Sequence, residues 1–419
     1  MATYQVRHYG SAAELRAAAP AWDDLWHRSN NSIPSARASL IALWLETFAP
    51  QADFRAIAIE QDGQLVAALP LVGSRLRGVL RVGKLPTGVW GEAGDLLVDP
   101  TCDVPAVLDH MVAALRRLPW PLLWLDSVPI ESGEWQQLRE ALSRNQLQHQ
   151  WHERFRIGKI NCNRSWGQYQ TDWSGNFRRQ MRKMVKRAEQ LGGVELVTSR
   201  PTHAAEIDRC LAEGFAVEDR GWKGAEGTSV LKNPVAYEYL RQQAHEMARL
   251  GHLELTFLQH QGQSIAFEYG WLGKGTYYSP KVGYDEAFAQ LSPGQLIRLK
   301  MCERFFADPE IHTWDFSGPL VEATEKWTTD SYPVTRMVIS TGQLRGRVLM
   351  HAYQSWWPKV RQARDYLRSR RSSECESNAA ASKSADRTTN TAADIRTAAP
   401  LAAPVDVSCD VTASVMQER

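Results

Sequence analysis

The sequence holds few cysteines, and none has a spacing that indicates a metal site or a disulfide framework. The six cysteines are scattered at positions 102, 162, 210, 302, 375 and 409. No CxxC pair and no cluster of Cys with His occurs, so the pattern favours ordinary reduced thiols. We therefore expect a protein that binds no metal.

Long apolar stretches and a strong charge of one sign are also missing. No apolar run approaches the roughly 20 residues of a transmembrane helix. The N-terminal segment 1–8 lacks the apolar core of a signal peptide, so we expect a cytoplasmic protein. The formal net charge is only +2, which argues against a broad nucleic-acid groove.

The length of 419 residues, with 43% hydrophobic residues, exceeds what one ordinary core holds and predicts two domains. The segment 344–371 alternates apolar and basic residues with helical spacing. It is expected either to lie on anionic membrane lipid, peripheral to an inner membrane, or to pack its aromatic face on the body of the protein. The Ala-, Ser- and Thr-rich end predicts disorder. The expected boundaries are 1–150, 151–343, 344–371 and 372–419.

The two halves of the folded part share one order of expected elements. In the second half these are a strand at 194–198, helices at 202–215 (with Thr202 as N-cap) and 237–250, three strand-like runs, a helix at 293–306, and strands at 313–316 and 336–340. The first half starts with a strand at 5–9 and a helix at 12–28. The turns Asp62-Gly63 and Gln261-Gly262 join corresponding hairpins. This similarity predicts a duplicated domain with an α/β (α+β) mixed sheet, in which antiparallel strands lead into one parallel crossover.

The helix expected at 174–187 is the most basic segment. Six of the ten residues from Arg178 to Arg187 are cationic. Like charges repel at neighbouring helical positions, so such a helix implies an anion lying across it or acidic residues that meet it. Because the planar arginine fork suits phosphate, we expect Arg178, Arg179 and Arg182 to bind a phosphate-bearing donor. The alternative is a solvated face paired with local acids.

A second candidate anion site is the start of the helix at 293–306. Ser292 stands at the N-cap and Pro293 at the first helical position. A helix N-terminus offers free N–H groups and a positive dipole end, and Gly294 allows a close backbone approach. We expect Ser292, Gly294 and Gln295 to hold a pyrophosphate or a similar anion; the alternative is a plain helix cap.

Four motifs and the order of elements resemble a known fold. The motifs are Asn176 to Lys183, Glu218 with Gly221-Trp222-Lys223, Tyr284-Asp285 with Ser292-Pro293-Gly294, and Asp315-Phe316-Ser317-Gly318 followed by Trp327. They resemble the GNAT acyltransferase fold and, within it, the CelD/BcsL-like acetyltransferases associated with bacterial cellulose and exopolysaccharide synthesis. The resemblance spans roughly residues 1–345. The tandem arrangement also resembles the FemABX peptidyltransferases, which use aminoacyl-tRNA instead of acyl-CoA.

An acyl transfer requires a proton acceptor and a group that stabilises the leaving thiolate. We expect Glu218 to be the general base with Asp219 beside it, in a loop just after a helix, since close carboxylates can raise each other's pKa. The alternative is pairing with Arg220 and Lys223. Tyr284 is expected to protonate the thiolate, or to be one more aromatic side chain.

Four further residues are expected to contact the substrate. They are Trp222, Lys223, Asp285 and Trp327. Asp315 lies in an apolar strand and therefore needs a partner, for which backbone N–H groups are the expected donors.

The resemblance implies an N- or O-acyltransferase that moves an acyl group, expected to be acetyl, from acyl-CoA to a sugar-containing or exopolysaccharide-related acceptor. No cysteine or serine has a nucleophile's setting, so direct transfer is expected. The second domain would hold the site, and the first would be a degenerate copy that walls the cleft. Two alternatives stay open, namely a FemABX-like transferase using charged tRNA and a non-enzymatic accessory module of polysaccharide synthesis.

Overall fold

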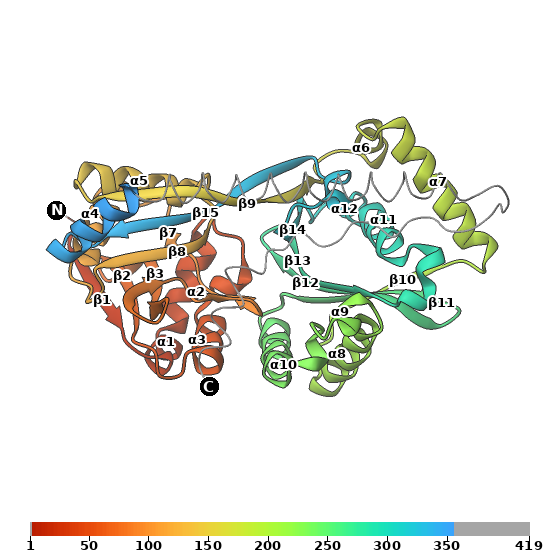
Figure 1. Cartoon of the computed structure of the whole chain (residues 1–419), viewed down its shortest axis with the longest axis horizontal. Helices are drawn as coiled ribbons and strands as arrows, with labels where there is room; N and C mark the ends of the chain where they lie inside the picture. Colours follow the sequence, from red (N-terminus) through yellow and green to blue (C-terminus); the bar gives the residue numbers. More distant parts are fainter. Residues whose placement is uncertain (1, 356–419) are drawn as a thin grey trace, which may run out of the picture.

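The computed structural model describes residues 2–355 and has two lobes that share one 13-stranded sheet (Figure 1). The strands of the first lobe are β1 (Tyr4–Tyr9), β2 (Phe54–Gln61), β3 (Gln64–Leu76), β4 (Leu80–Lys84), β7 (Leu97–Val98) and β8 (Leu122–Val128). Helices α1 (Ala12–Ala17), α2 (Ala19–Arg28) and α3 (Ala38–Phe48) cover one face, and α4 (Val104–Leu115) and α5 (Gly133–Arg144) cover the other. A separate two-stranded hairpin consists of β5 (Thr87–Gly88) and β6 (Gly91–Glu92).

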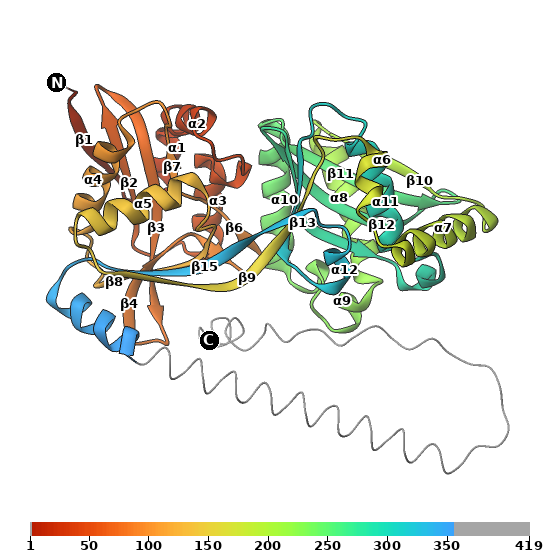
Figure 2. The same cartoon turned by 90° about the horizontal axis from the view of Figure 1, so that it is seen from above.

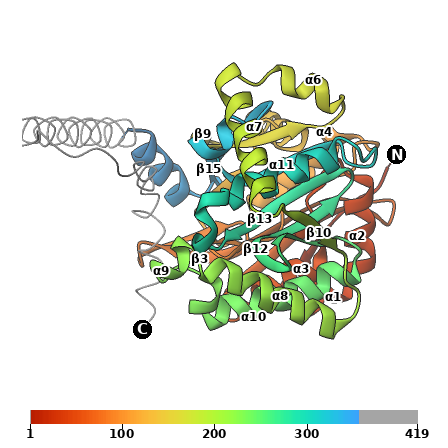
Figure 3. The same ribbon diagram turned by 90° about the vertical axis from the view of Figure 1, so that its right-hand side faces the viewer.

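The second lobe repeats this plan. Its strands are β9 (His149–Asn161), β10 (Glu195–Ser199), β11 (Leu253–His260), β12 (Gln263–Gly273), β13 (Thr276–Tyr284), β14 (Thr313–Pro319) and β15 (Asp330–Ser340). One face carries α6 (Trp166–Thr171), α7 (Gly175–Gln190) and α11 (Pro293–Phe305), and the other carries α8 (Ala204–Asp219) and α10 (Pro234–Arg249) (Figure 3). The short elements are α9 (Trp222–Ala225), the 3-10 helices η1 (Pro34–Ala36), η2 (Val230–Lys232) and η3 (Glu286–Leu291), and α12 (Glu322–Glu325).

Strands β9 and β15, which come last in the first and the second repeat of the sequence, are exchanged between the lobes. Strand β15 closes the second half of the sequence, yet it pairs with β8 of the first lobe, with Met337 opposite Leu125. Strand β9 follows the first-lobe helix α5, yet it pairs with β14 of the second lobe, with Ile160 opposite Trp314. The two strands also pair with each other along their length and run together between the lobes (Figure 2). Each lobe therefore completes the sheet of the other.

The duplicated order predicted from the sequence is confirmed in detail. Each lobe contains one parallel strand pair, β4 with β8 and β13 with β14. The later strand of each pair carries Trp-x-x-Ser, and Ser127 and Ser317 both have left-handed backbones, with φ of 63° and 53°. The hairpin turns Asp62-Gly63 and Gln261-Gly262 also have positive φ at both residues, as a two-residue type I′ turn requires.

Three large hydrophobic cores hold the lobes. One is shared by both lobes, since it joins α1, α2 and α3 to α8, α10 and the underside of the sheet. The second lies between the first-lobe sheet and α4 and α5, and the third lies under α6, α7 and α11. The shared core and the exchanged strands both predict that the lobes unfold together.

Several predicted boundaries are wrong, for local reasons. The helix expected at 12–28 is broken at Ala18, because Pro20 at the start of α2 cannot continue a preceding helix. Helix α8 starts after His203, not after Thr202, and runs on to Asp219. Glu218 and Asp219 therefore lie in its last turn and not in a loop. Helix α5, strand β9 and the β5–β6 hairpin were not predicted.

The described part of the helix expected at 344–371 covers residues 344–355 and packs on the sheet. Met350 is fully buried against Val82, Trp124 and Val338, and the rings of Tyr353 and Trp124 lie 5.4 Å apart. The side of this helix that carries Leu349, Met350 and Tyr353 thus faces the protein. The rest of that helix and the tail expected at 372–419 lie outside the described residues. Among the helices described, none is long and apolar enough to cross a membrane.

The shared sheet yields a testable expectation for stability. Met337 is fully buried in the core of the first lobe although it belongs to the last strand of the chain. Met337→Asp should cost more than about 3 kcal/mol, because a charge would be buried without a partner. Calorimetry should show one unfolding transition that moves as a whole to lower temperature.

The control is Leu344→Asp, at a side chain that is 79% exposed, which should leave the transition where it is. Two resolved transitions, of which Met337→Asp moves only one, would contradict the coupling of the lobes.

Candidate acyl-transfer site

The two parallel strands of the second lobe, β13 and β14, diverge. The wedge-shaped region between them is called the wedge below. Strands β13 and β14 pair only as far as Tyr278 opposite Asp315. Beyond that point β13 continues to Tyr284, while β14 bulges away from β9 before it pairs again at Pro319. The β14 side of β13 is therefore not used by the sheet from residue 279 onward. Its Val282 carbonyl accepts from Lys223, and the remaining backbone groups on this side can pair with a ligand that has amide groups of its own.

The start of α11 lies beside this wedge. Ser292 stands at the N-cap with φ 54°, but its side chain makes no capping hydrogen bond. The N–H of Gly294 has no acceptor among the described residues. A side chain on Gly294 would lie 3.3 Å from the ring of Tyr284, so glycine permits the close packing of these two elements. The first turn of α11 thus offers an open, positively polarised end.

The corresponding helix of the first lobe is closed. Asp103 is the N-cap of α4, and its carboxylate accepts a hydrogen bond from the N–H of Ala106 at 3.2 Å. A negative charge of the chain itself thus occupies the position where an anion would bind. The two lobes share a fold, but only the second has a helix end at this position that is open to an anion.

Glu218, the expected general base, is buried and has partners on both oxygens. Its Oε1 accepts from Lys223 Nζ at 2.7 Å, and its Oε2 accepts from the N–H of Val230 at 3.0 Å. The side chain of Lys223 also donates to the carbonyl of Val282 on β13 at 2.8 Å. A Cβ at Gly283 would lie 2.6 Å from Glu218 Cβ, so this glycine admits Glu218 against the strand. The Glu218–Lys223 pair therefore holds α8 and α9 against β13 beside the wedge.

The residues that follow Glu218, namely Asp219, Gly221 and Trp222, also lie beside the wedge. Asp219 accepts from Ser229 Oγ at 2.5 Å and lies 3.7 Å from Lys232 Nζ. A Cβ at Gly221 would meet the Tyr284 carbonyl at 2.5 Å, which explains glycine before Trp222. The side chain of Trp222 is 42% exposed and remains available to a ligand.

Asp285 anchors the loop between β13 and α11. Its Oδ2 accepts from Arg220 Nε at 2.6 Å, and its Oδ1 accepts from the N–H of Ala287 at 2.9 Å. The carboxylate is buried and caps η3. Both oxygens are engaged, so Asp285 fixes the path from β13 into α11.

Tyr284 lies at the end of β13, half-buried and beside Gly294. No hydrogen bond to its hydroxyl occurs within the described part of the chain. Burial, with a smaller contribution from Glu286, raises the pKa of Tyr284. A phenol that stays protonated at neutral pH can donate a proton, which is the role predicted for Tyr284.

Trp327 connects the basic helix with the start of α11. Its ring lies 5.2 Å from Phe177 of α7, and its Nε1 donates to Gln295 Oε1 at 2.9 Å. It is 1% exposed, so it acts on a ligand only through Gln295. The sequence predicted Arg178, Gln295 and Trp327 separately, and the fold brings their elements together.

The cations of α7 are exposed and have no acidic partner within the described residues. Arg178 donates to the carbonyls of Gln170 and Thr171, and Arg179 donates to the side chain of Asn176. None of the six cations forms an ion pair with a described residue, and all of them are exposed: Arg178, Arg179, Arg182, Lys183, Lys186 and Arg187. Of the two predicted alternatives, local acidic pairing is therefore not observed.

Two buried carboxylates, Asp315 and Glu268, lie near the wedge. Asp315 accepts from the N–H of Ser317 at 2.7 Å, as predicted, and from the hydroxyl of Tyr332 at 2.9 Å. Glu268 on β12 was not predicted from the sequence. It accepts from Ser279 Oγ, which in turn accepts from Trp314 Nε1 at 2.5 Å. Burial is the main cause that raises the pKa of Glu268 to about 7.

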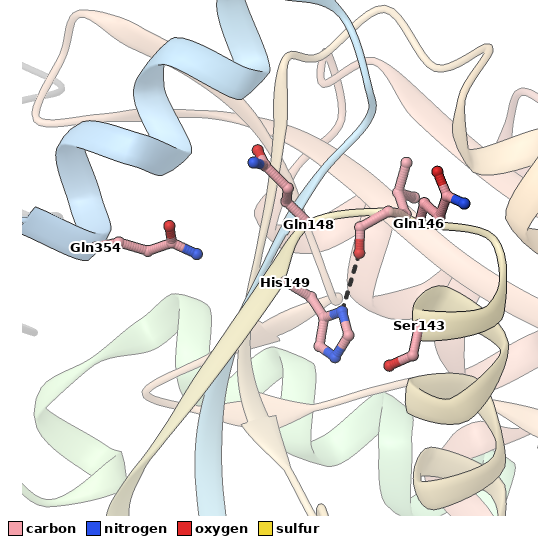
Figure 4. A pocket seen from close by; sticks show the side chains of 6 residues that line it. Ser143, Gln146, Gln148, His149 and Gln354 are labelled. Atoms are coloured by element: carbon pink, nitrogen blue, oxygen red, sulfur yellow. Dashed lines mark hydrogen bonds between the residues drawn. The ribbon is translucent and has the colours of Figure 1, made fainter.

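A hollow of about 300 Å³ lies elsewhere, between the end of α5, the start of β9 and the helix at 344–355 (Figure 4). His149 Nδ1 contacts the carbonyl of Leu147 there at 3.0 Å. The lining consists mainly of amide and hydroxyl side chains, and it lies in the first lobe, away from the wedge. Across the described residues, no three His, Cys, Asp or Glu side chains gather as metal ligands do.

Comparison with known proteins shows what the chain is similar to. Residues 175–327 match a family model described as an acetyltransferase (GNAT) domain. A conserved protein of unknown function from Bacteroides thetaiotaomicron and FemX have similar structures, each with 11% identity and a TM-score of 0.51. The alignments cover 80% of this chain and 100% and 96% of theirs. A tandem GNAT protein from the clavulanic acid biosynthesis pathway has 13% identity and a TM-score of 0.41, with 81% and 99% covered. No curated protein sequence matches.

The topology and the family match together define the class. The chain carries an acyltransferase domain of the GNAT type in its second lobe, and its first lobe repeats the fold. The matched residues run from the start of α7 to Trp327 and therefore contain the wedge and the open end of α11. GNAT domains take their acyl group from acyl-CoA, so the fold implies a small-molecule donor and an acceptor.

The pairing of Glu218 with Lys223 can be tested by double substitution. Lys223→Met should cost about 3–5 kcal/mol of unfolding free energy, because it leaves a buried carboxylate without its countercharge. Adding Glu218→Gln should recover much of this loss. Urea denaturation of the four chains measures both effects.

Lys232→Met is the matched control, since Lys232 is 51% exposed in its pair with Asp219 and should cost less than about 1 kcal/mol. An equally small cost for Lys223→Met would show that water screens the Glu218 pair.

Glu268 predicts a pH dependence of stability. Its folded pKa of about 7 lies above the unfolded value of 4.5, so its contribution is fully present below pH 4.5 and is lost as the pH rises through about 7. The loss amounts to at most about 3 kcal/mol. The stability difference between the native chain and Glu268→Gln should therefore shift in favour of the variant between pH 4.5 and 8.

Urea denaturation at both pH values gives this difference. Glu325→Gln, at an exposed side chain on α12, should show no such shift. A difference for Glu268→Gln that does not vary with pH would contradict the raised pKa.

Proposed function

We propose that this protein transfers an acyl group, with acetyl as the expected one, from acyl-CoA directly to an amine or hydroxyl of a sugar-containing acceptor. The observation that carries the proposal is the wedge between β13 and β14, which opens beside the uncapped end of α11. The sugar-containing, exopolysaccharide-related acceptor rests on the resemblance of the motifs to the CelD/BcsL-like acetyltransferases.

The donor would be held by three features. The amide-rich arm of the donor would pair with the unused edge of β13. The pyrophosphate would bind at Ser292, Gly294 and Gln295, where the N–H of Gly294, which has no acceptor among the described residues, and the helix dipole favour an anion. Arg178, Arg179 and Arg182 would meet further phosphate charge from α7, whose buried side contacts Trp327 and through it Gln295.

The reaction itself needs two proton transfers. The acceptor loses a proton as its nitrogen or oxygen bonds to the acyl carbon, and the carbon–sulfur bond breaks. Tyr284, protonated and beside the start of α11, would give its proton to the leaving thiolate. For Glu218 to accept the first proton, Lys223 would have to leave it. The contacts of Glu218, Asp219 and Asp285 favour a part in positioning Trp222, Lys223 and the donor loop.

The division of labour between lobes follows from the helix ends. The carboxylate of Asp103 fills the anion position of the first lobe, whereas α11 is open. We propose that residues 151–343 carry the reaction and that residues 1–150 form a degenerate copy that walls the site.

One observation favours a second donor. The six cations of α7, which form no ion pair with residues 2–355, also suit the phosphates of a charged tRNA, as in a FemABX-like transferase. Such binding would weaken steeply with salt, because each neutralised phosphate releases counterions. RNA binding of this kind, in a chain that does not bind acetyl-CoA, would favour this alternative.

Calorimetric titration of acetyl-CoA tests the main proposal. We expect binding to the intact chain and its loss in Gly294→Trp, because the indole would fill the space at the start of α11. Arg178→Ala with Arg179→Ala should weaken binding by about 1–3 kcal/mol, the range of charge-assisted hydrogen bonds.

Gly133→Trp is the control, since Gly133 begins α5 with no atom within 4 Å of its Cβ position, and it should bind like the intact chain. An intact chain that does not bind acetyl-CoA would overturn the proposal.

A further inference from the structure

A hairpin of the first lobe reaches across to the wedge of the second. The β5–β6 hairpin is held by Trp44 of α3, whose Nε1 donates to the Gly91 carbonyl at 3.1 Å. A Cβ at Gly91 would lie 2.7 Å from the ring of Tyr239 on α10. The ammonium of Lys281, on the free part of β13, lies 5.0 Å from the ring centroid of Trp90. The hairpin is therefore fixed against both lobes.

Glu92 ends this hairpin and is an exposed residue. Its Oε1 accepts a hydrogen bond from Ser127 Oγ at 2.7 Å. Ser127 is the left-handed residue near the end of β8, and this conformation turns its hydroxyl toward the hairpin. The other oxygen of Glu92 has no partner among residues 2–355. One oxygen thus holds the side chain in place, and the other is free.

Charged and titratable groups from four strands face Glu92. They are Asp126 on β8, Arg154 on β9, Asp315 on β14 and Tyr332 on β15. Asp315 marks the point where β13 and β14 part, so Glu92 lies toward the apex of the wedge. Desolvation is the largest cause that raises the pKa of Glu92, while Ser127 and Arg154 lower it and the two aspartates raise it. Glu92 is thus an exposed residue whose carboxylate lies close enough to atoms of both lobes for its pKa to be raised.

We propose that Glu92, supplied by the first lobe, accepts the proton of the acceptor in the reaction of the second lobe. This inference rests on the proposed acyl transfer. The N–H or O–H of the acceptor gives its proton to the free oxygen of Glu92, while its nitrogen or oxygen bonds to the acyl carbon. The carbon–sulfur bond breaks, and the sulfur takes a proton from Tyr284. Glu92 then gives its proton to water, and the Tyr284 phenolate takes one from water, so that both groups return to their starting state.

Other carboxylates near the wedge are less able to do this. Glu218 has both oxygens engaged, and Asp315 is 6% exposed with both oxygens bonded. Glu268 is 3% exposed and lies within the sheet. Glu92 combines a free oxygen, access from solvent and a side chain oriented by Ser127. A raised pKa also suits a base that works near neutral pH.

The location can be tested without knowing the acceptor. Carbodiimide with glycine ethyl ester converts accessible carboxyls into amides, which mass spectrometry assigns to residues. With acetyl-CoA at about ten times its Kd, labelling of Glu92 should fall about tenfold, because the acyl end of the donor would cover it. Labelling of Glu140, exposed on α5, should not change.

The chemical role is tested with Glu92→Gln. The variant should bind acetyl-CoA and unfold like the native chain, but hydrolyse acetyl-CoA, with water as acceptor, about a hundredfold or more slowly. Its rate should also lose the rise with pH that ionisation of Glu92 gives the native enzyme. Glu140→Gln should keep the native rate and profile.

The outcomes separate the two proposals. Acetyl-CoA that binds without protecting Glu92, or a Glu92→Gln chain with native rate and pH profile, would overturn the role of Glu92 alone. A native chain that does not bind acetyl-CoA would overturn the proposed function and this inference with it.

Discussion

The exchange of β9 and β15 is the constraint on which the rest of the structure depends. Backbone hydrogen bonds of each strand complete the sheet of the other lobe, and the edge of a sheet left without its partner would expose a row of unpaired groups. The exchange fixes the two lobes side by side and brings the end of β8 near the apex of the wedge. Ser127, Glu92 and Asp315 owe their proximity to it.

The two lobes have the same order of strands and helices, but they differ in the connection that leads to the helix expected to bind an anion. The parallel pair and the Trp-x-x-Ser strand occur in both. In the second lobe a short connection leads from β13 through η3 directly to an uncapped helix. In the first lobe the same interval holds the β5–β6 hairpin, and the helix that follows is capped by Asp103. The lobe with the closed helix end thus contributes a hairpin to the site of its neighbour.

Local signals in the sequence predicted much of the second lobe. The turn at Gln261-Gly262, the N-cap at Ser292 and the backbone partner of Asp315 are confirmed, because each depends on residues close in the chain. The placement of Glu218 was wrong, since one more turn of α8 put it inside the protein against Gly283. No local signal marks Glu92, because a two-residue strand in a Gly-rich loop has no periodicity to read.

The sequence by itself determined the fold class, the duplicated order of elements and the basic character of α7, because hydrophobic period, turn chemistry and composition are local properties. Only the tertiary structure decided which strand pairs with which lobe, which carboxylates are engaged, and which remain free beside the wedge. These depend on contacts between residues far apart in the chain, such as Glu92 with Ser127 and Met337 with Leu125. Their partners are chosen by the packing of the whole molecule and not by spacing along the chain.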